Sequence, residues 1–144
     1  MQQNKSLVDA AKKYLGLPYQ WGGYASNGEQ TALDCSGLVQ ASMCQIAKNF
    51  PRAKMHSQRM YHWLLDCGYC TVENEVTSED ILFFGKDINN ITHCAIAVNW
   101  YTMIEAAYGG KEVLTLDDAV KKGAFVLCTP VSRRSDLVAI LRLI

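Results

Sequence analysis

The stretch Leu33-Asp34-Cys35-Ser36-Gly37-Leu38-Val39 decides most of what can be predicted about this chain. A cysteine stands between a carboxylate and a hydroxyl, and a glycine and a helical apolar pattern follow. The pattern predicts that Cys35 lies at a helix N-terminus, where unpaired N–H groups and the macrodipole stabilise a thiolate. A cysteine in a protein core is usually structural. The polar neighbours Asp34 and Ser36, together with Gly37, which permits close approach, instead favour a reactive nucleophile.

Three helices are expected in the first half of the chain. Apolar residues recur at helical spacing in each of them, and glycine or proline follows each one. A turn and a polar loop that reaches Gln30 separate the first two helices. The expected helices are Lys5–Leu15, a second one capped by Asp34 or Ser36 that ends before Pro51, and His56–Asp66.

The second half of the chain shifts toward a period of two, which is typical of strands. Helices followed by strands indicate an α+β domain with segregated layers. No repeat or long linker divides the sequence, so we expect one domain over residues 1–144. The predicted strands are Ile81–Phe84, Cys94–Val98, Thr102–Ala106, Phe125–Pro130 and Leu137–Leu143.

Composition excludes several classes of protein. The 144 residues carry 14 basic and 14 acidic side chains, and no basic run suggests a nucleic-acid partner. The N-terminal residues show no secretory signal pattern, and no apolar stretch is long enough to span a bilayer. The six cysteines are expected to be reduced thiols rather than disulfides. Those in apolar runs, Cys44, Cys94 and Cys128, are expected to be buried.

His93 is the best candidate for a base that serves Cys35. The other two histidines, His56 and His62, lie beside charged residues or in the middle of a helix, whereas His93 opens a strand. An imidazole base needs a third group that orients its ring. If a three-residue loop, 99–101, joins the two neighbouring strands, Glu105 shares a face with His93 as a diagonal neighbour. A solvent-exposed charge on an edge strand is the alternative for Glu105.

A closely spaced pair of cysteines is a further feature of the sequence. Cys67-Gly68-Tyr69-Cys70 has the spacing of a zinc half-site or a redox pair, but no second ligand pair accompanies it. We therefore expect no metal and no cofactor. Trp21, beside a glycine pair, is a candidate for lining a substrate groove. Asp34 and Ser36 are candidates for contacting a substrate ammonium.

The order of these motifs resembles the NlpC family, which are papain-like cell-wall cysteine peptidases. The resemblance rests on four features, which are Tyr19-Gln20-Trp21-Gly22-Gly23, Asp34-Cys35-Ser36-Gly37, the segment 79–84 and His93 at the head of a strand. The resemblance implies N-terminal helices packed on a mainly antiparallel sheet. It also implies that Cys35 is the nucleophile, His93 the base, Glu105 the third polar residue and Tyr19 a neighbour of the oxyanion site. The family usually has His, Asn or Gln where this chain has Glu105.

The family resemblance implies hydrolysis of the bond between γ-D-glutamate and a diamino acid in peptidoglycan stem peptides. Two alternatives remain open, namely a papain-like acyltransferase or deamidase that acts on a protein, and a wall-binding module without turnover. Arginines in the segment 131–144 suggest a phage-encoded member. Without a recognisable export signal, we expect the enzyme to reach the wall or periplasm by lysis, dedicated secretion machinery or a phage particle.

Overall fold

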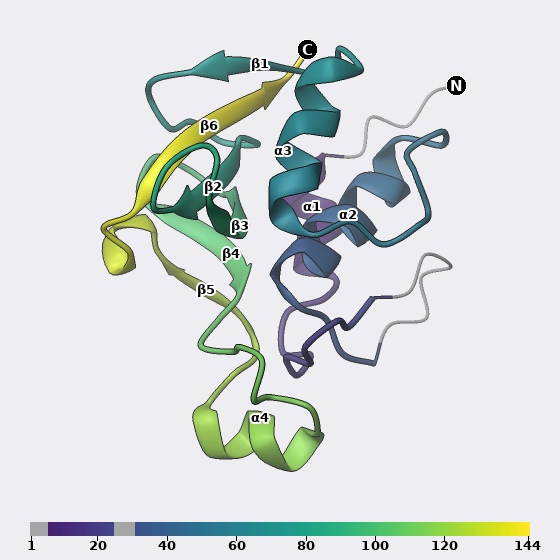
Figure 1. The fold of residues 1–144 in the computed structure, drawn as a ribbon, viewed down its shortest axis with the longest axis vertical. Helices are drawn as coiled ribbons and strands as arrows, with labels where there is room; N and C mark the ends of the chain where they lie inside the picture. Colours follow the sequence, from purple (N-terminus) through teal and green to yellow (C-terminus); the bar gives the residue numbers. More distant parts are fainter. Residues whose placement is uncertain (1–5, 25–30) are drawn as a thin grey trace.

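Three helices in the N-terminal half of the chain cover one face of an antiparallel sheet in the computed structural model, which describes residues 6–24 and 31–144 (Figure 1). The helices are α1 (Leu7–Lys12), α2 (Cys35–Ile46) and α3 (Ser57–Asp66). Side chains at the N-caps satisfy otherwise unpaired N–H groups of each first turn. The capping residues are Ser6, Asp34 and His56.

The sheet confirms the α+β prediction. Its strands are β1 (Cys70–Glu73), β2 (Ile81–Gly85), β3 (Ile91–Ala97), β4 (Thr102–Ala106), β5 (Val126–Pro130) and β6 (Leu137–Leu143). They lie in the order β1-β6-β2-β3-β4-β5, and every paired neighbour is antiparallel. The last strand of the chain therefore lies inside the sheet, between β1 and β2, rather than at an edge.

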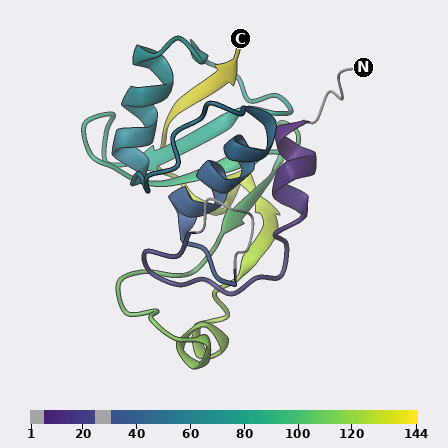
Figure 2. The same ribbon diagram turned by 90° about the vertical axis from the view of Figure 1, so that its right-hand side faces the viewer.

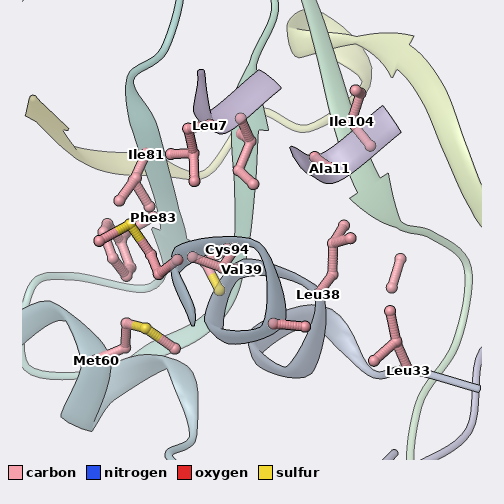
Figure 3. Packing of buried hydrophobic residues seen from close by; sticks show 14 of the residues in the cluster. Leu7, Ala11, Leu33, Leu38, Val39, Met60, Ile81, Phe83, Cys94 and Ile104 are labelled. Carbon is pink, nitrogen blue, oxygen red and sulfur yellow. The ribbon is translucent and has the colours of Figure 1, made fainter. Parts of the chain in front are cut away.

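The main core lies between the helices and the sheet. Figure 3 shows side chains from α1, α2 and α3 meeting those of the central strands, with Leu7, Val39 and Met60 opposite Phe83 and Cys94. A smaller apolar cluster on the other face of the sheet includes Leu82, Phe84 and Met103. The central strands β2 and β3 are thus buried on both faces, so an ionisable side chain there is shielded from water.

Several predicted boundaries were wrong in detail. The first helix ends at Lys12, and Leu15, expected on its apolar face, is 42% exposed. Lys5 and the predicted loop residues 25–30 lie outside the described residues. Cys128 is exposed because it lies on the edge strand β5, whereas Cys94 is fully buried on β3. All six cysteines are free.

Three elements were missed, β1, helix α4 (Leu116–Lys122) and the 3₁₀ helix Val131–Arg133, and all are short. Helix α4 lies apart from the three-helix layer, at the far end of the molecule in both ribbon views (Figures 1 and 2). Its start carries a capping box in which Thr115 and Asp118 bond each other's backbone N–H groups. Gly123 ends it in the left-handed conformation. This Thr-x-x-Asp signal was available in the sequence.

Candidate active site

Cys35 is the first residue of α2, as the sequence predicted. The Asp34 carboxylate accepts from the Gly37 N–H at 2.7 Å, which fixes the helix start one residue before the thiol. The first N–H groups of a helix have no acceptor within it, so they surround Cys35 with partial positive charge. The Cys35 Sγ also lies 3.9 Å from the Thr92 carbonyl oxygen, beside His93.

The DCSG stretch is joined to the glycine pair that precedes it. Asp34 N–H donates to the Gly23 carbonyl at 3.0 Å, and Gly22 N–H donates to Asp34 Oδ2 at 3.1 Å. A Cβ on Gly37 would collide with the Gly23 carbonyl oxygen, so only glycine allows this approach. The two sequence motifs are therefore one structural unit, which places Tyr19 and Trp21 beside Cys35 along the same cavity.

His93 and Glu105 meet across the β3–β4 hairpin. Ile96 pairs with Ile104 and the Val98 N–H donates to the Thr102 carbonyl, which is the register of the predicted three-residue loop. His93 Nε2 lies 2.7 Å from Glu105 Oε1. The alternative of a solvent-exposed edge charge is wrong for Glu105, because its side chain is fully buried and β4 lies between β3 and β5.

The electrostatics favour a thiolate–imidazolium pair. A hydrogen bond from Cys94 is the largest influence on the Cys35 pKa, and with the interaction from His93 it overcomes burial and lowers that pKa well below its ordinary value. Burial lowers the pKa of His93, but the Cys35 and Glu105 side chains together raise it. Because Glu105 occupies Nε2, the other ring nitrogen, Nδ1, is left for Cys35. One nitrogen for the nucleophile and one for an orienting acceptor is the arrangement that a general base needs.

Six of the seven predicted site residues line one cavity of about 470 Å³. Glu105 does not line it and lies behind His93. The cavity is large enough for a segment of peptide. The six lining residues are Tyr19, Trp21, Asp34, Cys35, Ser36 and His93.

Asp34 and Ser36 are already occupied by partners within the chain. Lys54 Nζ lies 3.0 Å from Asp34 Oδ2 and donates to Ser36 Oγ at 2.9 Å. Ser36 in turn donates to Asp34 Oδ1 at 3.3 Å. Burial raises the pKa of Asp34, and Lys54 offsets part of that rise. These contacts fit support of the helix start better than capture of a substrate ammonium.

Tyr19 is buried beside Cys35. Burial raises the pKa of its phenol, and the nearby Cys35 and Asp34 raise it further, so the hydroxyl stays protonated and able to donate. Gly109 lies directly against the Tyr19 ring, where any Cβ would clash with the ring carbons. The 108–110 loop therefore holds the ring in place at the cavity wall.

Arg133 and Thr129 are the partners of Glu105 that sequence reasoning missed. Arg133 Nε and Nη2 each lie 2.7 Å from an oxygen of Glu105, and Thr129 Oγ1 donates to Glu105 Oε2. In the sequence, Arg133 is one of several arginines in the C-terminal segment 131–144. The carboxylate predicted beside His93 was the available signal, because such a charge requires a partner if it becomes buried.

The described residues contain no group of three or more potential metal-ligating side chains, and no described helix has the length and apolarity of a membrane span. The Cys67–Cys70 pair splits between an exposed and a buried thiol.

The helical layer packed on a six-stranded antiparallel sheet is the architecture of the NlpC/P60 fold. The chain belongs to the NlpC/P60 family, a family of cell-wall peptidases, whose model matches residues 16–134. The family resemblance predicted from the motifs is thereby confirmed. The suggested phage origin stays a prediction.

Two curated relatives are endopeptidases by name. The chain is 36% identical over 96 residues to the bifunctional muramidase/DL-endopeptidase CwlT of Bacillus subtilis, covering 65% of this chain and 26% of the relative. It is 42% identical over 48 residues to a probable endopeptidase of Corynebacterium glutamicum, covering 33% of this chain and 21% of the relative. The chain thus spans about a quarter of the length of these relatives.

Solved structures confirm the fold. The NlpC/p60 domain of the peptidoglycan hydrolase SagA superposes with a TM-score of 0.66 at 21% identity, covering 99% of this chain and all of that one. RipD of Mycobacterium tuberculosis, described as a non-catalytic NlpC/p60 protein adapted to peptidoglycan binding, gives 0.64 at 18% identity and covers 100% and 99%. Because the same fold serves a non-catalytic protein, turnover has to be argued from the side chains of the site.

Proposed function

We propose that this chain is a cysteine peptidase that hydrolyses an amide bond in peptidoglycan stem peptides. The observation that carries the proposal is Cys35 at the N-terminus of α2, with a lowered pKa and His93 beside it on the wall of a peptide-sized cavity. Membership of a family of peptidoglycan hydrolases supports the substrate class. The bond between γ-D-glutamate and a diamino acid is the specific substrate that we propose.

The reaction follows from the positions of these groups. The Cys35 thiolate attacks the amide carbonyl carbon, and the negative charge that develops on its oxygen is stabilised by the Cys35 N–H and the Tyr19 hydroxyl. The His93 imidazolium donates its proton to the leaving amine, which departs as the thioester forms. His93 then accepts a proton from water, which attacks the thioester and releases the acid and the Cys35 thiolate. Glu105 holds the His93 ring through Nε2 during both steps.

Digestion of defined muropeptides by Cys35→Ala and His93→Ala variants tests the proposal. Each substitution should abolish product formation, because it removes the proposed nucleophile or the imidazole proposed to transfer its proton. Mass spectrometry of the products identifies both the cleaved bond and the stem composition. The matched control is Cys67→Ala, which removes an exposed thiol outside the cavity and should leave the rate unchanged. Full activity in Cys35→Ala would falsify the mechanism.

Two other functions would give different results in the same assays. A wall-binding module would bind muropeptides without releasing products, and iodoacetamide would label Cys35 no faster than the exposed Cys67 and Cys128. An acyltransferase or deamidase would modify a protein substrate and leave muropeptides intact. Rapid labelling of Cys35 below pH 7 together with stem-peptide cleavage is the outcome that we expect.

The proposed site of action is the cell wall or periplasm, because the proposed substrate is found there. Release by lysis, export by dedicated machinery and delivery in a phage particle are the routes that we consider. Immunodetection of the protein in wall, medium and phage fractions would distinguish them.

A further inference from the structure

The Glu105 carboxylate has no vacant acceptor position. Oε1 contacts His93 Nε2 and Arg133 Nη2, each at 2.7 Å. Oε2 contacts Thr129 Oγ1 at 2.5 Å and Arg133 Nε at 2.7 Å. The guanidinium of Arg133 therefore approaches the carboxylate as a two-pronged fork, which fixes the plane of the carboxylate as well as its position.

This fork also changes the charge that His93 experiences. A buried carboxylate without a counter-ion would hold a neighbouring imidazolium strongly and resist release of its proton. The Arg133 guanidinium offsets part of that charge, although Glu105 still raises the pKa of His93. The Glu105–Arg133 pair thus presents to Nε2 a directed acceptor whose negative charge is partly balanced.

Arg133 is itself held in place from a second side. It ends the short 3₁₀ helix Val131–Arg133, which follows β5, and its guanidinium lies 4.6 Å from the centre of the Tyr108 ring. Tyr108 adopts a left-handed backbone conformation (φ 61°), which is costly for a tyrosine and turns the 108–110 loop along the cavity wall. Stacking on the ring and the fork on Glu105 together leave the guanidinium little freedom.

The other groups around His93 can be accounted for. Cys35 approaches from α2, and Cys94 is its neighbour on β3. Phe84 of β2 contributes an apolar ring, 5.6 Å from the imidazole between centres. Asp136 also faces His93, but its charge is paired with Arg134, whose Nη2 lies 2.7 Å from its carboxylate. Glu105 is therefore the carboxylate that bonds the His93 ring directly, and Arg133 is the cation that bonds Glu105.

We propose that Arg133 is a positioning residue for the thiol reaction, acting through Glu105 to hold the His93 ring in one orientation and to offset part of the carboxylate charge that would otherwise retain its proton. The inference rests on the proposed function. Arg133 also lines the cavity, but the proposed effect reaches the reacting atoms through Glu105, which both prongs of the guanidinium contact.

A double-mutant cycle tests this inference with Arg133→Met, Glu105→Gln and the double variant. Arg133→Met exposes His93 to an uncancelled carboxylate, so the pH at which the imidazolium is lost should move up. Glu105→Gln exposes His93 to an uncancelled guanidinium, so that pH should move down. The double variant presents a neutral acceptor and should return it toward the wild-type value. NMR titration of the His93 ring measures this pH directly, and the pH profile of Cys35 alkylation by iodoacetamide measures it without a peptidoglycan substrate.

Turnover provides the second readout. We expect each single variant to lower kcat by about tenfold or more, with little change in KM, as is typical when a partner of a functional histidine is lost. The double variant should be several-fold faster than Glu105→Gln alone. Arg133→Lys keeps the charge but loses the fork, so it should keep the wild-type pH dependence with a reduced kcat. Arg59→Met, an exposed arginine outside the cavity, is the control.

The outcomes separate this inference from the proposed function. Unchanged His93 titration in Arg133→Met, or additive losses in the double variant, would show that Arg133 only supports the fold. If muropeptides are not cleaved but the opposed shifts appear, the proposed substrate is wrong and the coupling stands. Thermal unfolding of each variant identifies any that fails to fold. If Arg133→Met does so, Arg133→Lys and the double variant still decide the question.

Discussion

At the residue scale, the buried Glu105 has the largest electrostatic consequence. Burial would raise the pKa of this carboxyl, but hydrogen bonds from His93 and Arg133 outweigh burial and lower the pKa to about 2. A carboxyl whose pKa is lower in the folded state stabilises the fold above its unfolded pKa. That contribution is lost as the pH falls toward the folded value.

We therefore predict acid sensitivity that depends on Glu105. The wild-type free energy of unfolding should fall between about pH 4.5 and pH 2, with up to about 3 kcal/mol from this one group. Urea unfolding at pH 6 and at pH 3 measures the difference. The Glu105→Gln/Arg133→Met variant has no such carboxyl and should lose that part of the pH dependence. An equal pH dependence in both proteins would contradict the ion-pair description.

At the element scale, the junction between the glycine pair and the start of α2 positions Cys35. Glycine within a helix is ordinarily unfavourable compared with alanine. Gly37 is required nonetheless, because the Gly23 carbonyl oxygen occupies the space that a Cβ would need. The contact is backbone to backbone, so neither side can move aside cheaply.

Gly37→Ala should therefore destabilise the protein by about 1–3 kcal/mol despite its better helix propensity, as overpacking of a tight contact does. Chemical denaturation measures this change. Gly110→Ala is the matched control, since its Cβ would meet only the flexible end of the Glu112 side chain. A stabilised Gly37→Ala protein would show that the junction yields and that the close approach is not obligatory.

At the scale of the whole molecule, the C-terminal strand completes the sheet. The family model ends at residue 134, whereas β6 follows it and pairs with both β1 and β2. Its Arg142 binds the fully buried Asp80 through two nitrogens, at 2.8 and 2.9 Å. Loss of this strand would expose the edges of two others and leave a buried carboxylate without its counter-ion.

Truncation after Asp136 should thus destabilise the entire domain, so that the truncated protein no longer shows a cooperative unfolding transition. A merely local effect at the C-terminus is not expected. Circular dichroism during heating measures it, and removal of Ile144 alone is the control, since this residue lies beyond β6. A truncated protein that still melts in one sharp transition would refute the central role of β6.

Sequence alone determined the position of Cys35 at the start of α2, the three-helix layer and most strands. These are local properties, because caps, periodicity and glycines act within a few residues of one another. Even the His93–Glu105 contact followed from the sequence, since a short hairpin loop sets the register of the strands beside it. The roles assigned to the seven site residues stay predictions for the experiments above.

Only the tertiary structure decided what surrounds those residues. Arg133 is 28 positions from Glu105 and Lys54 is 20 from Asp34, and no local periodicity links such partners. The place of β6 inside the sheet is equally non-local. When long-range packing buries a charge, the tertiary fold also determines which counter-ion lies beside it. The sequence motifs therefore identified His93 as the candidate base. They could not predict which charges surround His93 and set its pKa.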